Sequence, residues 1–153
     1  NAHKEKTLYM ADNAKLTVMN DFHIRYGSNI EIHKDAQLFI HGQKFGYSGA
    51  NINLTIICWG KIEIGSDVSI GVNVLIRDSS NHFINRQGYK AKRSVIIGDK
   101  CWLCESCTIM PGVRLGEGCI VGAKSFVINS FPANSLISGH PAKIVDKNVL
   151  WKY

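Results

Sequence analysis

Proline and long apolar runs are scarce in this sequence of 153 residues, which contains only 3 prolines. With charged residues at 20% and hydrophobic residues at 45%, its composition is that of a folded domain and excludes a disordered chain. No run of 18 apolar residues occurs, so we expect no membrane span. Acidic residues are also in the minority, because 18 lysines and arginines against 12 acids leave a net charge of +6. This balance favours an anionic partner.

Cysteine is present five times, an odd number that does not suit a disulfide framework. Three of the five stand at Cys101, Cys104 and Cys107, a spacing that invites a zinc or iron–sulfur interpretation. No second ligand pair follows at zinc-finger spacing, and the same positions belong to a repeat described below. We therefore expect no metal, and we expect free thiols in a reducing cytoplasm.

Leucine is rare for a domain of this size, with 9 leucines against 19 isoleucines and 10 valines. β-Branched residues favour strands over helices. The sequence also has 14 glycines, which suit tight turns. Together these features predict a β-rich fold and argue against a helical bundle.

An aliphatic residue recurs at every sixth position in the second half of the chain. The positions are Ile97, Leu103, Ile109, Leu115, Val121 and Val127. A small or apolar residue follows each of them four positions later, and glycine follows several directly, as at Gly98. The same frame holds upstream at Ile64, Ile70 and Ile76, and loosens before Ile52.

A period of six fits neither a helix nor an ordinary strand. It fits a flat side of about five residues followed by a turn, so that three sides make a triangular coil and coils stack through parallel strand pairing. The aliphatic residue is expected to point into the prism, and the small residue or glycine to let the chain turn the corner. A β-sandwich with accidental spacing is the alternative, and its strands would alternate in twos.

The sequence resembles the hexapeptide-repeat acyltransferases over residues 26–146. It is most similar to the branch that holds galactoside and maltose acetyltransferases and bacterial polysaccharide or sialic acid O-acetyltransferases. The segments that carry the resemblance are 97–103, 111–116, 121–125 and 139–143. It implies an all-β fold, a left-handed parallel β-helix, an exception to the usual right-handed crossover. It also implies a homotrimer with active sites between subunits and acetyl-CoA as the acetyl donor.

A single domain is expected over residues 1–153. Within it, residues 1–25 are expected to form an irregular N-terminal cap, and residues 132–153 a C-terminal tail with a short helix. The frame breaks once in the middle, between Ile76 and Ile97, and residues 77–94 are expected to form one extruded active-site loop.

This loop contains one histidine, His82, and five basic residues against one acid, Asp78. From composition alone, a single histidine in a polar loop is more often solvated than catalytic. In the family that the chain resembles, a segment at this place carries the catalytic histidine. A sugar hydroxyl is a weak nucleophile at neutral pH, so its attack on a thioester needs such a general base. Asp78 is a candidate to orient the imidazole.

The resemblance assigns two further residues to the catalytic site. Asn53, in the segment Asn51–Ile56, matches an asparagine that lines the acceptor and acetyl site; its alternative role is that of a turn residue. Trp102 matches a tryptophan beside the catalytic histidine, and its indole would form a wall for pantetheine or acceptor. Its alternative role is packing against a neighbouring subunit.

The resemblance also implies contacts to both substrates. For the donor, the positions that match are Trp102, Glu105, Gly122, Ala123, Lys124, Asn129 and Lys143. Glu105 and Cys104 replace the small pair that is common in the family. For the acceptor, we expect contacts from Asn53, Arg77, Asn81 and Arg86.

The function predicted from the sequence is transfer of acetyl from acetyl-CoA to a hydroxyl of a saccharide or polysaccharide. The basic loop suggests an anionic glycan such as a sialylated polymer, although its charge would equally serve the phosphates of CoA. N-acetylation of an amino sugar nucleotide and acetylation of an antibiotic are the enzymatic alternatives. A β-helical carbonic anhydrase would need three zinc-binding histidines, and no His-x-x-x-x-His pair lies near His82. A non-catalytic scaffold is the remaining class. We expect no nucleic-acid partner.

Overall fold

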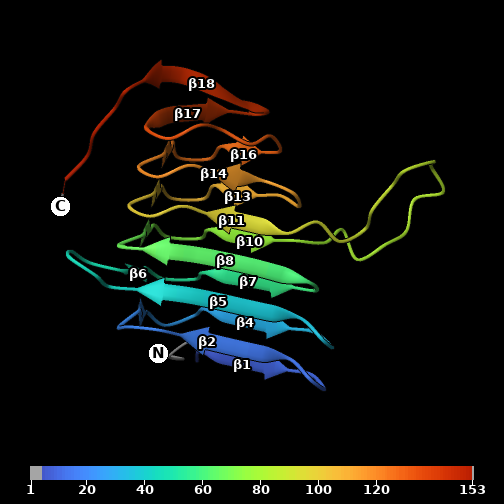
Figure 1. Ribbon diagram of the computed structural model, residues 1–153. Helices are drawn as coiled ribbons and strands as arrows, with labels where there is room; N and C mark the ends of the chain where they lie inside the picture. Colours follow the sequence, from blue (N-terminus) through green and yellow to red (C-terminus); the bar gives the residue numbers. More distant parts are fainter. Residues whose placement is uncertain (1–4, 153) are drawn as a thin grey trace.

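Three parallel sheets form the sides of a prism in the computed structural model, which describes residues 5–152 (Figure 1). Sheet A contains β1 (Thr7–Met10), β4 (Asn29–Ile32), β7 (Thr55–Cys58), β10 (Leu75–Arg77), β13 (Thr108–Ile109) and β16 (Phe126–Val127). Sheet B contains β2 (Lys15–Val18), β5 (Gln37–Gly42), β8 (Lys61–Ser66), β11 (Val95–Ile97) and β14 (Arg114–Leu115). Sheet C contains β3 (His23–Ile24), β6 (Gly49–Ala50), β9 (Ser69–Ile70), β12 (Trp102–Leu103), β15 (Ile120–Val121), β17 (Ser135–Gly139) and β18 (Ala142–Lys147).

The chain visits the sheets in the order A, B, C, so each strand up to β17 pairs in parallel with the strand one coil earlier. We call the three corners the A/B, B/C and C/A edges, after the sheets that each corner connects. The result is a stack of coils, a parallel β-helix, which confirms the fold class predicted from the six-residue period. In the described residues no helix is long and apolar enough to span a membrane.

The six-residue frame supplies the interior of the prism. All six aliphatic positions from Ile97 to Val127 are at most 2% exposed. The second position of the frame is also internal, at Cys101, Cys107, Val113, Cys119 and Ser125. Branched aliphatic side chains therefore fill the prism coil by coil, and each coil completes the core of its neighbours.

Glycines in the frame have a different role from the one expected. Gly98 does not have the positive φ of a corner residue; instead, a Cβ at Gly98 would lie 2.8 Å from the backbone nitrogen of Glu117 in the next coil. The left-handed corner residues of these coils are Lys100, Ser106, Gly112, Gly118 and Lys124. Glycine at position 98 is thus needed for close stacking of coils, and mostly other residues turn the corners.

The coils differ in length along the chain. Ile96 pairs with Arg114 in sheet B, and the interval between these two partners is three six-residue sides without insertion. The early coils are longer, because Asn29 pairs with Thr55, an interval that exceeds three such sides. Much of that excess is a second extruded segment, residues 43–48 at the B/C edge, which the six-residue frame does not predict.

Both ends of the chain differ from expectation. Residues 7–24 contain the regular strands β1, β2 and β3, so the first coil stands where an irregular cap was expected. The expected C-terminal helix is wrong within the described residues. β18 instead folds back on β17 as an antiparallel strand. The last residue of the expected tail, Tyr153, lies outside the described residues.

Candidate active site

The C/A edge brings together residues that lie far apart in the sequence. Glu105 and Ala123 precede the paired strands β13 and β16 by the same number of positions, so they lie one full coil apart and stack. The backbone nitrogen of Lys124 donates to the carbonyl oxygen of Glu105 at 2.9 Å. Gly122 belongs to the same corner, and Asn53 turns this edge in an earlier coil. Five predicted site residues thus form one line along the prism.

Asn53 takes a left-handed backbone conformation with φ of 60°, as suits a corner asparagine. Its Nδ2 donates to Oδ1 of Asn73, the corner residue of the next coil, at 2.8 Å. Its own Oδ1 is buried and has no hydrogen-bond partner among the described residues. The structure therefore shows the turn role, and it leaves one amide oxygen as an acceptor without a donor.

The C-terminal hairpin extends this edge. A Cβ at Gly122 would lie 2.9 Å from Oγ of Ser138, so β17 lies directly over the Gly122 corner. Lys143 of β18 pairs with Ser138. Lys143 is therefore near the other predicted donor residues. Asn129 follows β16 at the A/B edge, on the opposite side of sheet A, and is not brought to them.

The long loop, residues 78–94, leaves the stack at the A/B edge and projects away from it (Figure 1). Its foot is closed by an antiparallel bridge between Ser79 and Lys92. His82 is exposed, and its carbonyl oxygen accepts a hydrogen bond from the Tyr89 hydroxyl at 3.2 Å. The ring of Tyr89 packs edge-on against Phe83, with centroids 5.9 Å apart. The histidine predicted as the base is thus held on an arm outside the prism.

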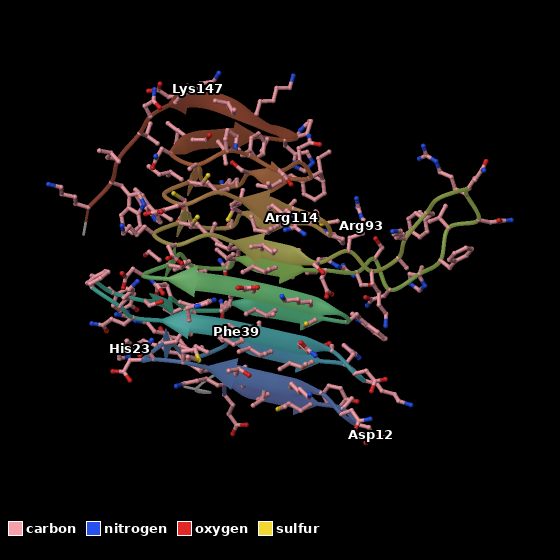
Figure 2. The ribbon with its side chains drawn as sticks, in the orientation of Figure 1. Asp12, His23, Phe39, Arg93, Arg114 and Lys147 are labelled. Atoms are coloured by element: carbon pink, nitrogen blue, oxygen red, sulfur yellow. The ribbon has the colours of Figure 1, made fainter. Side chains whose placement is uncertain are left out.

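The remaining predicted acceptor residues belong to this loop or its foot. Nε of Arg77 donates to the carbonyl oxygen of Ser79 at 2.6 Å. The backbone nitrogen of Asn81 donates to Oγ of Ser79 at 3.0 Å. Arg86 lines a cavity of about 380 Å³ within the loop, together with Tyr89. Figure 2 shows Arg93 where the loop leaves the stack.

Asp78 does not orient His82, contrary to the sequence-based suggestion. It is fully buried, and its carboxylate accepts hydrogen bonds at 2.7 Å from the backbone nitrogens of Trp59 and Gly60. Burial, followed by the charge of Asp78, raises the pKa of the Cys58 thiol to about 12. Lys92 lies 5.8 Å from the centroid of the Trp59 ring. Asp78 and Lys92 therefore anchor the foot of the loop to the coil below.

Trp102 lies on the outer face of sheet C and is 40% exposed. Its ring centroid is 5.7 Å from that of Trp151, whose Nε1 donates to the carbonyl oxygen of Lys100 at 2.7 Å. Within one chain Trp102 is not next to His82, because the loop leaves from the A/B edge. Sequence reasoning missed Trp151, since no repeat signals which part of the stack the tail will contact.

The cysteine run does not converge on one point. Cys101 and Cys107 are fully buried inside successive corners, whereas Cys104 between them is half-buried. Burial raises the pKa of Cys107 to about 12 and also raises that of Cys104. A hydrogen bond from Cys101 lowers the pKa of Cys119 to about 7, since it favours the thiolate. Within residues 5–152, no group of three or more metal-ligating side chains is placed to hold a metal.

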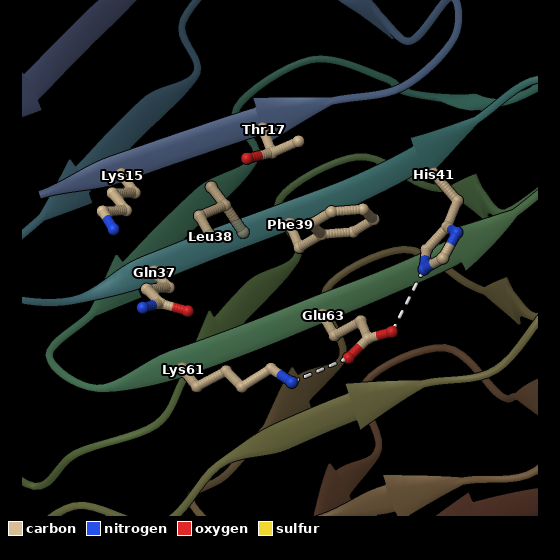
Figure 3. Close-up of a pocket in the computed structure, with 8 residues that line it drawn as sticks. All are labelled: Lys15, Thr17, Gln37, Leu38, Phe39, His41, Lys61 and Glu63. Carbon is tan, nitrogen blue, oxygen red and sulfur yellow. Dashed lines mark hydrogen bonds and ion pairs between the residues drawn. The ribbon is translucent and has the colours of Figure 1, made fainter.

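A further cavity of about 270 Å³ lies on the outer face of sheet B and contains none of the predicted residues (Figure 3). Glu63 lines it and lies 3.1 Å from both Nε2 of His41 and Nζ of Lys61. The hydrogen bond from His41, followed by Lys61, outweighs burial and lowers the pKa of Glu63. Glu63 thus has two partners within the cavity wall, His41 and Lys61.

Comparison with known proteins agrees with the repeat. The family described as "Bacterial transferase hexapeptide (six repeats)" matches residues 94–129. The chain is 31% identical over 105 residues to the putative colanic acid biosynthesis acetyltransferase WcaF of Escherichia coli K12, covering 69% of this chain and 57% of WcaF. The chain thus spans a little over half the length of this curated relative.

Solved structures share the fold over nearly the whole chain. The polysialic acid O-acetyltransferase OatWY is 30% identical, with a TM-score of 0.70, covering 97% of this chain and 67% of OatWY. The polySia-specific acetyltransferase NeuO is 26% identical, with a TM-score of 0.73, covering 90% of this chain and 64% of NeuO. An acetyltransferase from Vibrio cholerae complexed with acetyl-CoA also shares the fold. It is 24% identical, with a TM-score of 0.60, covering 92% of this chain and 71% of the Vibrio cholerae chain.

Proposed function

Because the chain belongs to the hexapeptide-repeat acetyltransferase family, we propose that it transfers an acetyl group from acetyl-CoA to a hydroxyl of a saccharide. One observation carries this proposal: the C/A edge lines up Asn53, Glu105, Gly122, Ala123 and Lys124 from separate coils. A straight edge of small and polar corner residues suits an extended pantetheine arm, whose amides need backbone partners along their length.

The proposed donor site ends near the top of the stack. Lys143 on β18 offers an exposed ammonium group for a phosphate of CoA. The residues fit acetyl-CoA in chemistry as well as in place, because Gly122 and Ala123 are small and the end of the edge is cationic. When bound, acetyl-CoA supplies the activated thioester.

His82 acts as the general base. Neutral imidazole accepts the proton of the sugar hydroxyl while the hydroxyl oxygen attacks the thioester carbonyl carbon. The carbonyl π electrons move to oxygen, and a backbone N–H at a coil corner stabilises that oxyanion. The oxyanion then re-forms the carbonyl, the carbon–sulfur bond breaks, and CoA leaves with the proton that His82 held. The products are an acetyl ester and CoA.

Assembly completes the site in this proposal. His82 is on an exposed arm at the A/B edge, and Trp102 is on the outer face of sheet C, so one copy does not bring them together. A homotrimer would bring the loop of one subunit to the face of sheet C of the next. Asn129 and Lys124 lie at opposite edges of sheet A. In such a trimer they would contact CoA in two different active sites, or opposite ends of one CoA molecule.

We propose an anionic polysaccharide, such as a sialic-acid polymer, as the acceptor. The loop and its foot carry five cations, which are Arg77, Arg86, Lys90, Lys92 and Arg93. The acid of the loop, Asp78, is buried and used in hydrogen bonds, so it leaves these cations available for an anionic ligand. Relatives named for polysialic acid add support.

The test measures CoA release from acetyl-CoA by chromatography, with sialic acid oligomers, neutral maltooligosaccharides and no acceptor. We expect release that depends on the acidic acceptor, together with an acetyl ester detected by mass spectrometry. Release that no saccharide stimulates would overturn the proposed function.

A further inference from the structure

The outer face of sheet C is hollow below Trp102. In the strand register Trp102 pairs with Ser69, Ser69 with Gly49, and Gly49 with His23, so these residues form one column across four strands. The two middle members, Ser69 and Gly49, have small side chains or none. The face therefore dips between the Trp102 indole and His23, which Figure 2 shows on the side of the stack opposite the loop.

Tyr47 reaches into this dip from the short loop, residues 43–48. Its ring lies parallel to that of His23, at 9° with centroids 5.7 Å apart. A Cβ at Gly49 would lie 2.6 Å from the carbonyl oxygen of His23 and 2.8 Å from the Tyr47 hydroxyl, so glycine allows β6 to approach β3 closely and leaves room for this ring. Sequence reasoning missed Tyr47 because its loop lies where the six-residue frame has already loosened.

Three cavities of about 240, 360 and 530 Å³ all include Tyr47 in their walls, and the two larger ones also share Arg25. They therefore adjoin at Tyr47, and we call this row of cavities the trough. At the B/C edge the trough is bounded by Phe45 and Trp151. It then passes Tyr47 and reaches Arg25 and Asn51 near the C/A edge. Because Asn51 precedes Asn53 by two residues, the trough leads toward the predicted acetyl site.

The aromatic end of the trough is held in place. The Asp67 carboxylate accepts backbone hydrogen bonds from Lys44 at 2.7 Å and from Phe45 and Gly46 at 3.0 Å. Burial raises the pKa of Asp67, but these three donors outweigh it and the net shift is downward. Phe45 is 81% exposed although its backbone is fixed in this way. A loop whose backbone is fixed in advance binds with less loss of conformational entropy.

The charge around the trough is positive. Four cationic side chains line the cavities, namely Lys6, Arg25, Lys100 and Lys152. Asp67 is the one acid among the described lining residues, and its oxygens are already used. Lys100 is paired with Glu117 at 3.0 Å, which leaves three cations for a ligand.

We propose that this trough binds the acceptor, a chain of acidic sugars, with sugar rings against Phe45 and Tyr47 and a carboxylate paired with Arg25. The proposal rests on the proposed function and names its acceptor site. Aromatic faces suit the apolar faces of sugar rings, and the guanidinium fork of Arg25 suits a carboxylate. CoA is the other ligand to consider for the trough, because it has an adenine ring and phosphates. The corner residues assigned to CoA, however, lie in the later coils, above Trp102.

Direct binding tests the site separately from catalysis. Calorimetry without acetyl-CoA compares a sialic acid tetramer with maltotetraose, using the assembled protein. We expect the acidic tetramer to bind and the neutral one to bind at least about 10-fold more weakly. Arg25→Ala and Tyr47→Ala should each weaken the acidic tetramer about 10-fold or more, whereas Tyr47→Phe should stay within about 3-fold.

Phe39→Ala is the matched control, because Phe39 is a half-buried aromatic on the outer face of sheet B. It should leave binding unchanged. If Tyr47→Ala fails to fold, Arg25→Ala and Tyr47→Phe carry the test. Equal binding by the parent, Arg25→Ala and Tyr47→Ala overturns the proposal, as does a loss of CoA affinity in place of tetramer affinity. Tetramer binding without acetyl transfer would overturn the proposed function and leave the site standing.

Discussion

The regular coils and the long loop use their side chains in opposite ways. From Val95 to Val127 inward side chains recur twice in each hexapeptide, and each coil completes the core of its neighbours. From residue 80 to residue 88 every residue is exposed, and the loop is fixed to the stack only at its foot. Changes in the coils should therefore affect folding, and changes in the loop should affect chemistry. Four experiments test this division, in order of expected effect.

Ile109→Ala should have the largest effect. Ile109 is fully buried in the middle of the stack, so the truncation loses apolar burial and leaves a cavity. We expect a loss of about 2–5 kcal/mol in the free energy of unfolding, measured in urea. Phe83→Ser, at a loop side chain that is 75% exposed, is the comparison and should stay within about 0.5 kcal/mol. Equal losses would contradict the division.

His82→Ala should affect catalysis and leave the stability of the fold unchanged. Loss of a general base is expected to lower the rate of acetyl transfer by about 100-fold, equivalent to about 2.7 kcal/mol of barrier. The melting temperature should not change, because His82 is exposed. Asn85→Ala, another exposed loop residue, should retain the parent rate. A parent-like rate in His82→Ala would remove this residue from the mechanism.

Gly98→Ala tests the stacking role of glycine. Its new Cβ would press on the backbone of the Glu117 corner, and we expect a loss of about 1–3 kcal/mol in unfolding free energy. At Gly60 a Cβ would have its nearest contact at 3.4 Å, with Oδ2 of Asp78, so Gly60→Ala should cost clearly less. Similar costs for both would mean that backbone contact between coils is not what glycine provides.

Asp67→Asn should have the smallest effect, about 1 kcal/mol at neutral pH, since the amide keeps one acceptor oxygen for the short loop. The folded-state pKa of Asp67 lies below its ordinary value of 3.8. Its stabilisation is therefore complete above pH 3.8 and is lost as the pH falls through the folded-state value. The difference between parent and variant should shrink in acid. A difference in unfolding free energy that does not depend on pH would contradict the charged role of Asp67. The control is Asp146→Asn, at an exposed residue, which should lose no unfolding free energy at any pH.

The sequence predicted the stack wherever three six-residue sides repeat without insertion. It did not reveal the first coil or the loop of residues 43–48, because the longer early coils shift the frame and hide the alternation of inward and outward residues. The tail was also mispredicted. Only Ala142 of the strand Ala142–Lys147 is buried, and the strand is stabilised by pairing with β17, a contact that local sequence does not encode.

The candidate site divides in the same manner. Residues at the C/A edge were predictable together because an uninterrupted coil of three six-residue sides stacks Glu105 with Ala123. The surroundings of Trp102 were not predictable, since they depend on the C-terminal tail. The orientation of His82 was not predictable either, since it depends on a loop outside the repeat. Asp78 shows the limit most clearly: its place four positions before His82 suggested a partner, and burial made it an anchor for Trp59 and Gly60.

The antiparallel strand β18 has a consequence for how long the stack can grow. In a β-helix, as in a cross-β fibril, new strands pair in parallel at the end of the stack. An end with unpaired parallel strands is therefore a template on which another molecule can add. At this end β18 runs against the direction of the sheet, with a register shift between Leu136 and Ile137 and with Lys143 and Lys147 exposed. In sheet C a second molecule therefore finds no parallel edge at this end to extend. The reversed strand closes sheet C there and prevents parallel strands from adding to that sheet.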